Sequence, residues 1–287
     1  MSADEAHYEG EQNDAGLPHG RGTCWWGPAE GTPGGGGSIG SGGVSGDRYE
    51  GEWRDGRKHG RGVYTWACGD RYEGDWADNE RHGQGSQFYA ASGNRYDGAC
   101  AHDRKHGNGT LSLASGDVYS GPWVDDVKEG EAGEYRWANG DRYVGSWSAD
   151  QRAGRGELTL ACGDSYAGDW RANSKNGNGT YKWVDGDRYE GEWRNDIKEG
   201  RGTYISGSGD RYEGEWRDDK KEGRGTLLTA SGDRYEGDWH EDCREGKGMF
   251  TSARTGDRYE GDWHQDTKHG TGVYTWATGD RFEGEWR

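Results

Sequence analysis

The chain of 287 residues has a net charge of −17, contains 57 glycines, and is only 29% hydrophobic. This composition is typical of disordered chains, but 16 tryptophans and 17 tyrosines exclude that class, because disordered segments are poor in aromatic residues. The acidic charge excludes bulk binding of nucleic acid, which needs a basic surface. The five cysteines are widely spaced and include no C-x-x-C pair, so neither a disulfide framework nor a zinc site is predicted.

The chain begins with a degenerate copy of a repeat, predicted over residues 1–26, in which Tyr8 and Gly10 match the later copies. A Gly-rich insertion follows over residues 27–45. Its composition predicts a flexible segment. The repeat array proper is predicted over residues 46–287, and it ends in a single terminal strand.

Each repeat of the array starts from a reference aromatic residue that recurs every 23 or 24 positions. A glycine stands two residues after each reference and, in most copies, a tryptophan stands four residues after it. Because side chains in a strand alternate between faces, these three residues share one face. The charged residues between them lie on the other face. The reference residues are Tyr49, Tyr72, Tyr96, Tyr119, Tyr143, Tyr166, Tyr189, Tyr212, Tyr235, Tyr259 and Phe282.

The second half of each repeat predicts a second strand. Gly60-Arg-Gly62 is followed by Tyr64, again at a spacing of two, and polar residues such as those at 54–57 connect the two strands. Gly-Asp pairs such as Gly69-Asp70 end each repeat, and glycine supplies the positive φ of tight turns. The fold predicted is therefore all-β: an elongated, twisted, single-layer antiparallel sheet of tandem hairpins. Glycines on the aromatic face would leave room for neighbouring rings, and single-residue insertions would mark altered turns or bulges.

These motifs resemble the MORN repeat (membrane occupation and recognition nexus), and residues 47–62 are close to its consensus. The resemblance covers about residues 46–287 and, less closely, 8–24. It implies a hairpin-repeat fold and an interaction role, since such arrays occur in junctional membrane proteins and in ciliary radial spoke heads. Residues 8–22 also resemble the start of the radial spoke head component 1 family. Animal members of that family carry an acidic tail after their repeats, whereas residues 281–287 still match the repeat.

Two candidate interaction sites follow from the repeat pattern. The first is a partner-binding aromatic face made of Trp53, Trp76, Trp123, Trp147, Trp170, Trp193, Trp216, Trp239 and Trp263. The second is a terminal-edge assembly site made of Trp263, Phe282 and Trp286, because exposed sheet edges invite strand addition. A homodimer through the C-terminal end is expected from the second site. The fourth repeat is also irregular, with Cys100 in place of its tryptophan and Leu111 and Leu113 in place of later aromatic residues.

No catalytic, cofactor-binding or metal-binding residues are predicted. His59, His82, His106 and His269 recur at one repeat position, but successive repeats lie about 10 Å apart, too far to share a zinc ion. Carboxylate pairs such as Asp125-Asp126 lie in turns, where no burial raises their pKa for acid–base catalysis. The chain is therefore predicted to be a non-enzymatic protein without a cofactor.

The predicted function is a structural scaffold that binds other proteins, of axonemal or cytoskeletal type. A radial-spoke-head-like component of the ciliary or flagellar axoneme is the favoured form of that prediction. The alternatives are a phospholipid-contact module, which the net charge disfavours, and a cytoskeletal scaffold. No N-terminal apolar run marks a signal peptide, so a cytoplasmic location, in a cilium or flagellum, is expected.

Overall fold

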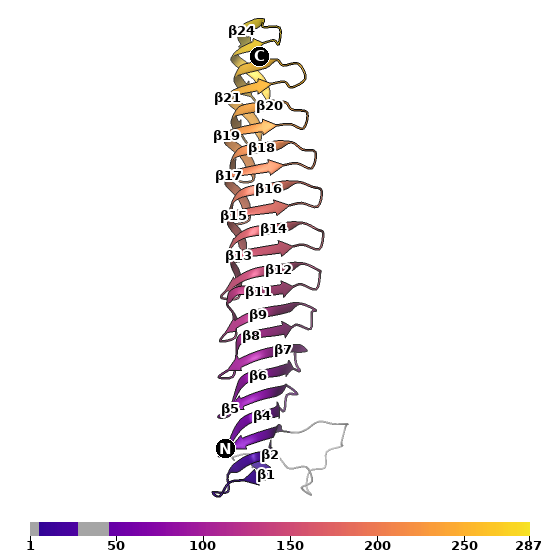
Figure 1. Ribbon diagram of the computed structural model, residues 1–287, viewed down its shortest axis with the longest axis vertical. Coiled ribbons are helices and arrows are strands. Elements are labelled where there is room, and N and C mark those ends of the chain that lie inside the picture. Colours follow the sequence, from indigo (N-terminus) through magenta and orange to yellow (C-terminus); the bar gives the residue numbers. More distant parts are fainter. Residues whose placement is uncertain (1–5, 28–45) are drawn as a thin grey trace. The chain divides into compact units, whose positions relative to one another are not determined.

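A computed structural model describes residues 6–27 and 46–287 of the chain (Figure 1). Two compact units are distinguished: one comprises Met1–Asn139 and Trp147–Asp150, and the other comprises Gly140–Ser146 and Gln151–Arg287. The described residues contain no helix, and every strand belongs to an antiparallel sheet of tandem hairpins. The predicted all-β fold class is confirmed. In the described part of the chain, no helix is long and apolar enough to cross a membrane.

The strands of the first unit are β1 (Ala6–Gln12), β2 (Pro18–Trp26), β3 (Asp47–Arg54), β4 (Arg57–Thr65), β5 (Arg71–Ala77), β6 (Glu80–Tyr89), β7 (Asn94–Ala101), β8 (Arg104–Ser112), β9 (Val118–Val124), β10 (Val127–Lys128) and β11 (Gly130–Arg136). The next strand, β12 (Arg142–Ser148), contributes residues to both units.

The strands of the second unit are β13 (Gln151–Thr159), β14 (Ser165–Arg171), β15 (Ser174–Lys182), β16 (Arg188–Arg194), β17 (Ile197–Ile205), β18 (Arg211–Arg217), β19 (Lys220–Leu228), β20 (Arg234–His240), β21 (Cys243–Thr251), β22 (Arg258–His264), β23 (Thr267–Thr275) and β24 (Arg281–Trp286).

Consecutive strands pair in a register that recurs from repeat to repeat. Between hairpins, β4 and β5 place Tyr64 opposite Tyr72, Gly62 opposite Gly74 and Gly60 opposite Trp76. Along β5 the reference tyrosine, the glycine and the tryptophan are buried, and the residues between them are more exposed. The alternation predicted from spacing is confirmed, and one face of the sheet forms the core.

From β3 onward, each hairpin turn places two consecutive residues in the left-handed region. Asp55 and Gly56 have φ of 50° and 79°, and Asp218 and Asp219 have φ of 48° and 66°. Two positive φ values define a type I′ turn, whose twist suits a hairpin and which Asp and Asn tolerate. The neighbouring hairpin fixes the second turn residue: the Asp219 amide donates to the Lys198 carbonyl at 3.2 Å, and Asp219 Oδ1 accepts from the Lys198 amide at 2.9 Å. One aspartate therefore joins two hairpins.

A second aspartate joins neighbouring hairpins at the other end of the strands, in the loops between hairpins. Asp164 Oδ1 accepts a hydrogen bond from the Val184 amide at 2.9 Å, and its Oδ2 accepts one from the Tyr181 hydroxyl at 2.8 Å. In one repeat an asparagine occupies the position, and Asn94 Oδ1 accepts from the Ala114 amide at 3.0 Å. The Gly-Asp pair thus has two functions: glycine makes the turn and aspartate bonds to the next repeat.

The Gly-x-Gly segment of the second strand contains a β-bulge. In the β3–β4 pair, Gly51 lies opposite Gly62 but Glu52 lies opposite His59, so two residues of β4 have no partner in β3. Gly60, one of those two, has a φ of 58°. Residues with a Cβ rarely adopt that conformation, which explains the first glycine of the motif.

The single-residue insertions lie at turns and bulges, as predicted. The usual end loop closes with a hydrogen bond from the Gly69 amide to the Trp66 carbonyl, three residues back. In the longer repeat that ends with β6, the Gly93 amide reaches the Tyr89 carbonyl, four residues back. In another long repeat the extra residue is accommodated at the bulge, where Glu129 separates β10 from β11.

The reference tyrosines occupy the space that the glycines leave. Ten of them, in the series Tyr49 to Tyr259, are 0–2% exposed. A Cβ added to Gly62 would lie 2.3 Å from the Tyr49 hydroxyl oxygen, and one added to Gly51 would lie 2.6 Å from it. The Tyr49 hydroxyl donates to the Glu52 carbonyl at 2.9 Å. The predicted room for a ring is confirmed, and tyrosine fills it.

The first hairpin pairs directly with the array. β2 lies beside β3, with Trp26 opposite Asp47 and Gly20 opposite Trp53. The Trp53 indole nitrogen donates to the Gly22 carbonyl at 3.1 Å. Tryptophans of later repeats make the equivalent hydrogen bond, as Trp76 does to the Gly62 carbonyl. Residues 28–45, which are all but the first residue of the predicted Gly-rich insertion 27–45, lie outside the described residues.

Candidate interaction surface

A repeated cluster of tyrosine, tryptophan and a basic residue forms the core. The Tyr189 and Trp216 rings meet edge to face, with centroids 5.2 Å apart. Lys198 Nζ lies 4.5 Å from the Trp216 ring centroid, and the indole nitrogen donates to the Gly202 carbonyl at 3.1 Å. Burial raises the pKa of Tyr189 and lowers the pKa of Lys198. The cluster combines ring packing, a cation–π contact and a satisfied indole N–H.

The nine tryptophans predicted as a partner-binding aromatic face lie inside this core. They are Trp53, Trp76, Trp123, Trp147, Trp170, Trp193, Trp216, Trp239 and Trp263, and their exposed fractions are 3–6%. Lysine and arginine side chains cover the rings, as Lys58 does with Nζ 4.4 Å from the Trp76 ring centroid. Partner binding on this side stays a prediction, but these indole rings are not available as a contact surface.

The irregular fourth repeat fills the place of a tryptophan with polar groups. Cys100 is buried, and burial raises the pKa of its thiol. The Arg81 guanidinium lies 5.8 Å from the Tyr72 ring centroid and donates to Gln87 at 2.9 Å and to Asp103 at 3.1 Å. Gln87 is itself buried. Arg81 thus keeps the contact that the basic residue makes with the reference tyrosine in other repeats, and it also donates to a buried polar side chain, Gln87.

The residues predicted as a terminal-edge assembly site lie at the last strands. Trp263 is buried, Phe282 is 46% exposed and Trp286 is half-buried. The Trp286 indole donates to the Gly272 carbonyl at 3.3 Å, and Phe282 meets Trp286 edge to face at 5.6 Å. Dimerisation through these residues stays a prediction.

The recurring histidines lie apart from one another along the array. His269 meets His264, which does not belong to the recurring series, with ring centroids 5.6 Å apart. His264 also meets Glu245 at 2.9 Å. Within residues 6–27 and 46–287, no three or more His, Cys, Asp or Glu side chains are grouped to hold a metal ion.

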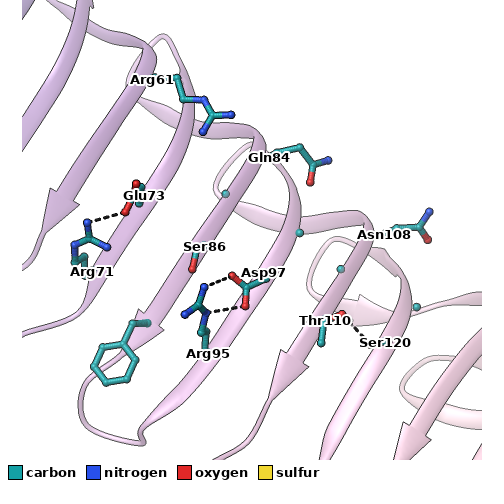
Figure 2. A pocket seen from close by; sticks show the side chains of 15 residues that line it. Arg61, Arg71, Glu73, Gln84, Ser86, Arg95, Asp97, Asn108, Thr110 and Ser120 are labelled. Carbon is teal, nitrogen blue, oxygen red and sulfur yellow. Dashed lines mark hydrogen bonds and ion pairs between the residues drawn. The ribbon is translucent and has the colours of Figure 1, made fainter.

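The charged face of the sheet is hollowed. In the first unit an open groove of about 1120 Å³ crosses β4 to β9, and a second of about 890 Å³ crosses β19 to β24 in the other unit. Figure 2 shows the first groove, with side chains from successive strands along it. Its polar lining includes Arg61, Gln84, Ser86, Asn108, Thr110 and Ser120.

Ion pairs within single strands flank the groove in the first unit. Arg71 meets Glu73 at 2.7 Å, and Arg95 holds both carboxylate oxygens of Asp97, at 2.7 Å and 2.8 Å (Figure 2). The hydrogen bond from Arg95 keeps the pKa of Asp97 below its usual range, and the same bond raises the pKa of Arg95. Both carboxylates that line this groove are therefore neutralised locally.

The uncharged part of this groove was not predicted from the sequence, although a signal for it exists. The residue after the reference tyrosine is acidic in β3, β5 and β7, as Glu50, Glu73 and Asp97, but it is Ser120 in β9. The residue between the two glycines changes from Arg61 to Gln84. The loss of charge is visible when equivalent positions of the charged face are compared between repeats. The spacing of the aromatic residues does not indicate it.

Solved structures with limited similarity include TCP10 domains of two proteins. A point mutant of the TCP10 domain of Danio rerio CPAP is 9% identical, with 78% of this chain and 99% of that chain covered and a TM-score of 0.38. The wild-type domain in complex with a peptide of Danio rerio STIL is 11% identical, with 80% of this chain and 98% of that chain covered and a TM-score of 0.26. The TCP10c domain of Drosophila melanogaster Sas-4 is 11% identical, with 63% of this chain and 93% of that chain covered and a TM-score of 0.29. Similarities this low do not bear on function.

The curated proteins contain no match to the chain. The family model of the MORN repeat, in contrast, matches eleven segments that together cover most of the sequence. The segments are residues 14–28, 49–71, 72–93, 96–118, 119–142, 143–165, 166–188, 189–211, 212–234, 235–254 and 259–281. Their spacing is that of the hairpins described above, so the chain belongs to the MORN-repeat family.

Proposed function

We propose that the chain is a non-enzymatic scaffold that binds other proteins and works in the axoneme of a cilium or flagellum, in a radial-spoke-head-like assembly. The observation that carries the scaffold role is the hairpin array itself, in which each repeat presents equivalent side-chain positions on the charged face. Arrays of this kind bind through extended surfaces. MORN-repeat membership supports the same role.

The axonemal setting rests on the first repeat. Residues 8–22 resemble the start of the radial spoke head component 1 family. β1 and β2, which contain them, form a regular hairpin that pairs with β3. The segment that carries the family resemblance is therefore also a hairpin of the array, as expected if the first repeat contributes to assembly.

A phospholipid-contact role is the weaker candidate. Membrane-surface binding by aromatic residues needs rings that can enter the headgroup region. The nine repeat tryptophans are 3–6% exposed, and the net charge of −17 opposes adsorption to anionic lipid.

Localisation in a ciliated cell tests the proposal. The full chain with a small tag is expressed, and the cells are extracted with detergent before imaging and fractionation. We expect the chain to stay with the axoneme after extraction, with the tag alone as control. Release of the chain into the soluble fraction would contradict the proposed location in the axoneme. Flotation with neutral and with anionic vesicles forms the second arm, and co-flotation with either would favour the lipid role.

A further inference from the structure

The groove on the charged face of the first unit contains an uncharged window, which we define as Ser86, Thr110 and Ser120 together with Gln84 and Asn108. Thr110 and Ser120 hydrogen-bond to each other at 2.8 Å across β8 and β9. Figure 2 shows these five side chains on neighbouring strands of the groove. Interface centres are depleted in charged residues, because covering an ion is costly. The window is therefore the part of this groove that a partner can cover at the lowest cost in desolvation.

An exposed aromatic ring adjoins the window. Phe88 lines the groove and is 44% exposed. It lies opposite Arg71 on β5 and opposite Arg95 on β7. The corresponding residues of the adjacent repeats are the small polar Thr65 and Ser112, so the ring is a local feature. Aromatic residues, including phenylalanine, and arginine are enriched at protein interfaces.

The charges of the groove favour an acidic partner segment. Its lining holds three arginines, Arg61, Arg71 and Arg95, against two carboxylates, and both carboxylates are already held by arginine. Arg61 is 72% exposed on its side chain and meets one carboxylate, Asp75, at 3.0 Å. The groove over β19 to β24 has the opposite balance, because four glutamates line it against three basic residues. The two grooves therefore differ in the charge of the segment they suit.

We infer that the groove over β4 to β9 is the docking site for a short peptide segment of a partner protein that carries an apolar residue beside acidic residues. The apolar residue packs on Phe88, uncharged backbone and side-chain groups cover the window, and the acidic residues face Arg61. This inference rests on the proposed scaffold function and adds to it a binding site and a partner chemistry.

Peptide selection on the purified full chain tests the inference. A random peptide library displayed on phage is selected on the immobilised chain, enriched sequences are synthesised, and affinity is measured by fluorescence anisotropy at physiological ionic strength. We expect enriched peptides to combine an apolar residue with acidic ones. Enrichment of basic peptides, or no enrichment over a chain with Phe88→Ser, would overturn the inference.

Two variants locate the binding. Phe88→Ser removes the ring and introduces the small polar residue type of the adjacent repeats. Ser120→Glu places a carboxylate in the window. This carboxylate has no arginine two residues before it, unlike Glu73 and Asp97. Each is expected to weaken peptide binding by about tenfold or more. Ser120→Glu combined with Val118→Arg rebuilds the usual ion pair and should recover part of the loss. Glu236→Ser, in the other groove, is the matched control and should leave affinity within about twofold.

The outcomes separate this site from the proposed function. If peptide affinity is unchanged by both Phe88→Ser and Ser120→Glu, this groove is not the docking site. The scaffold role then depends on another surface, and the chain would still be found in the axoneme. If the chain is released from axonemes while the peptides bind as described, the axonemal setting fails and the docking site remains.

Discussion

At the scale of single residues, the contact between tyrosine and glycine defines the repeat. The sequence predicts that Tyr, Gly and Trp share a face, because their spacing is two, and that glycine leaves room for a ring. It does not predict which ring, because alternation gives the face of a side chain but not the direction in which it leans. In the structure Tyr189 lies across Gly191 and Gly202 of its own hairpin, so that a Cβ on either would contact its hydroxyl.

Substitution of one such glycine tests that contact. Gly202→Ala would place a Cβ 2.3 Å from the Tyr189 hydroxyl oxygen and 2.5 Å from Cζ, so the ring or the strand must move. We expect a loss of about 1–3 kcal/mol in the free energy of unfolding. A lower urea midpoint and faster hydrogen exchange in β16, β17 and β18 would show it.

The adjacent Thr203→Ala is the control for Gly202→Ala. Thr203 lies between the glutamates Glu190 and Glu213 on the charged face, away from the tyrosine. Its change should cost about 0.5 kcal/mol or less. If both variants lose the same stability, the ring contact is not the reason for the glycine.

At the scale of the hairpin, the structural elements are predictable and their connections are less so. Two strands for each repeat and the Gly-Asp end turn follow from the spacing. The type I′ turns without glycine do not, because aspartate tolerates a positive φ without requiring it, as at Asp218 and Asp219, and alanine rarely adopts one, as at Ala149. Hydrogen bonds from the neighbouring hairpin hold that conformation, and such contacts between repeats are absent from a single-repeat pattern.

The aspartate at the end turn gives a prediction at this scale. Asp164→Ala removes the acceptor of the Val184 amide and of the Tyr181 hydroxyl. We expect a cost of about 1–2 kcal/mol, because two hydrogen bonds between repeats are lost. Urea denaturation and the exchange rate of the Val184 amide measure it.

Asp164→Asn is expected to be much milder than Asp164→Ala. Asparagine keeps the Oδ1 acceptor, and the chain already uses it at Asn94, where Oδ1 accepts from the Ala114 amide at 3.0 Å. The Val184 amide should then exchange almost as slowly as in the natural chain. An asparagine variant as unstable as the alanine variant would mean that the charge or the second acceptor, which binds the Tyr181 hydroxyl, stabilises the turn rather than the bond from the Val184 amide.

At the scale of the whole molecule, the sequence predicts the two faces but not which of them a partner can reach. The aromatic face was the predicted binding surface because it contains the most distinctive residues. In the structure basic residues at the start of the second strand of each hairpin extend over the rings, as Lys58 does with Nζ 4.3 Å from the Tyr64 ring centroid. Long basic side chains cover apolar surface in this way while their charge stays near water. The periodicity of the sequence does not reveal this cover.

The same burial predicts a steep loss of stability in alkaline solution. Burial raises the pKa of all ten buried reference tyrosines, to about 12 for Tyr143. A raised folded pKa gives stability that is complete below the unfolded pKa, about 10, and is lost as the pH rises toward the folded pKa. One unit above pH 10, each tyrosine that stays protonated when folded costs about 1.4 kcal/mol, so the nine with large shifts together cost on the order of 10 kcal/mol. That equals a typical free energy of unfolding.

Tyrosinate absorbance and far-ultraviolet circular dichroism, recorded together as the pH rises, measure this effect. We expect the buried tyrosines to ionise in the same steep transition in which the sheet is lost. Tyr189→Phe, which removes the hydrogen bond to the Glu192 carbonyl, should lower stability at neutral pH. It should also make the alkaline decline shallower, because one ionising group fewer is released on unfolding. Gradual tyrosine ionisation while the sheet signal persists would show that solvent reaches these hydroxyls in the folded chain.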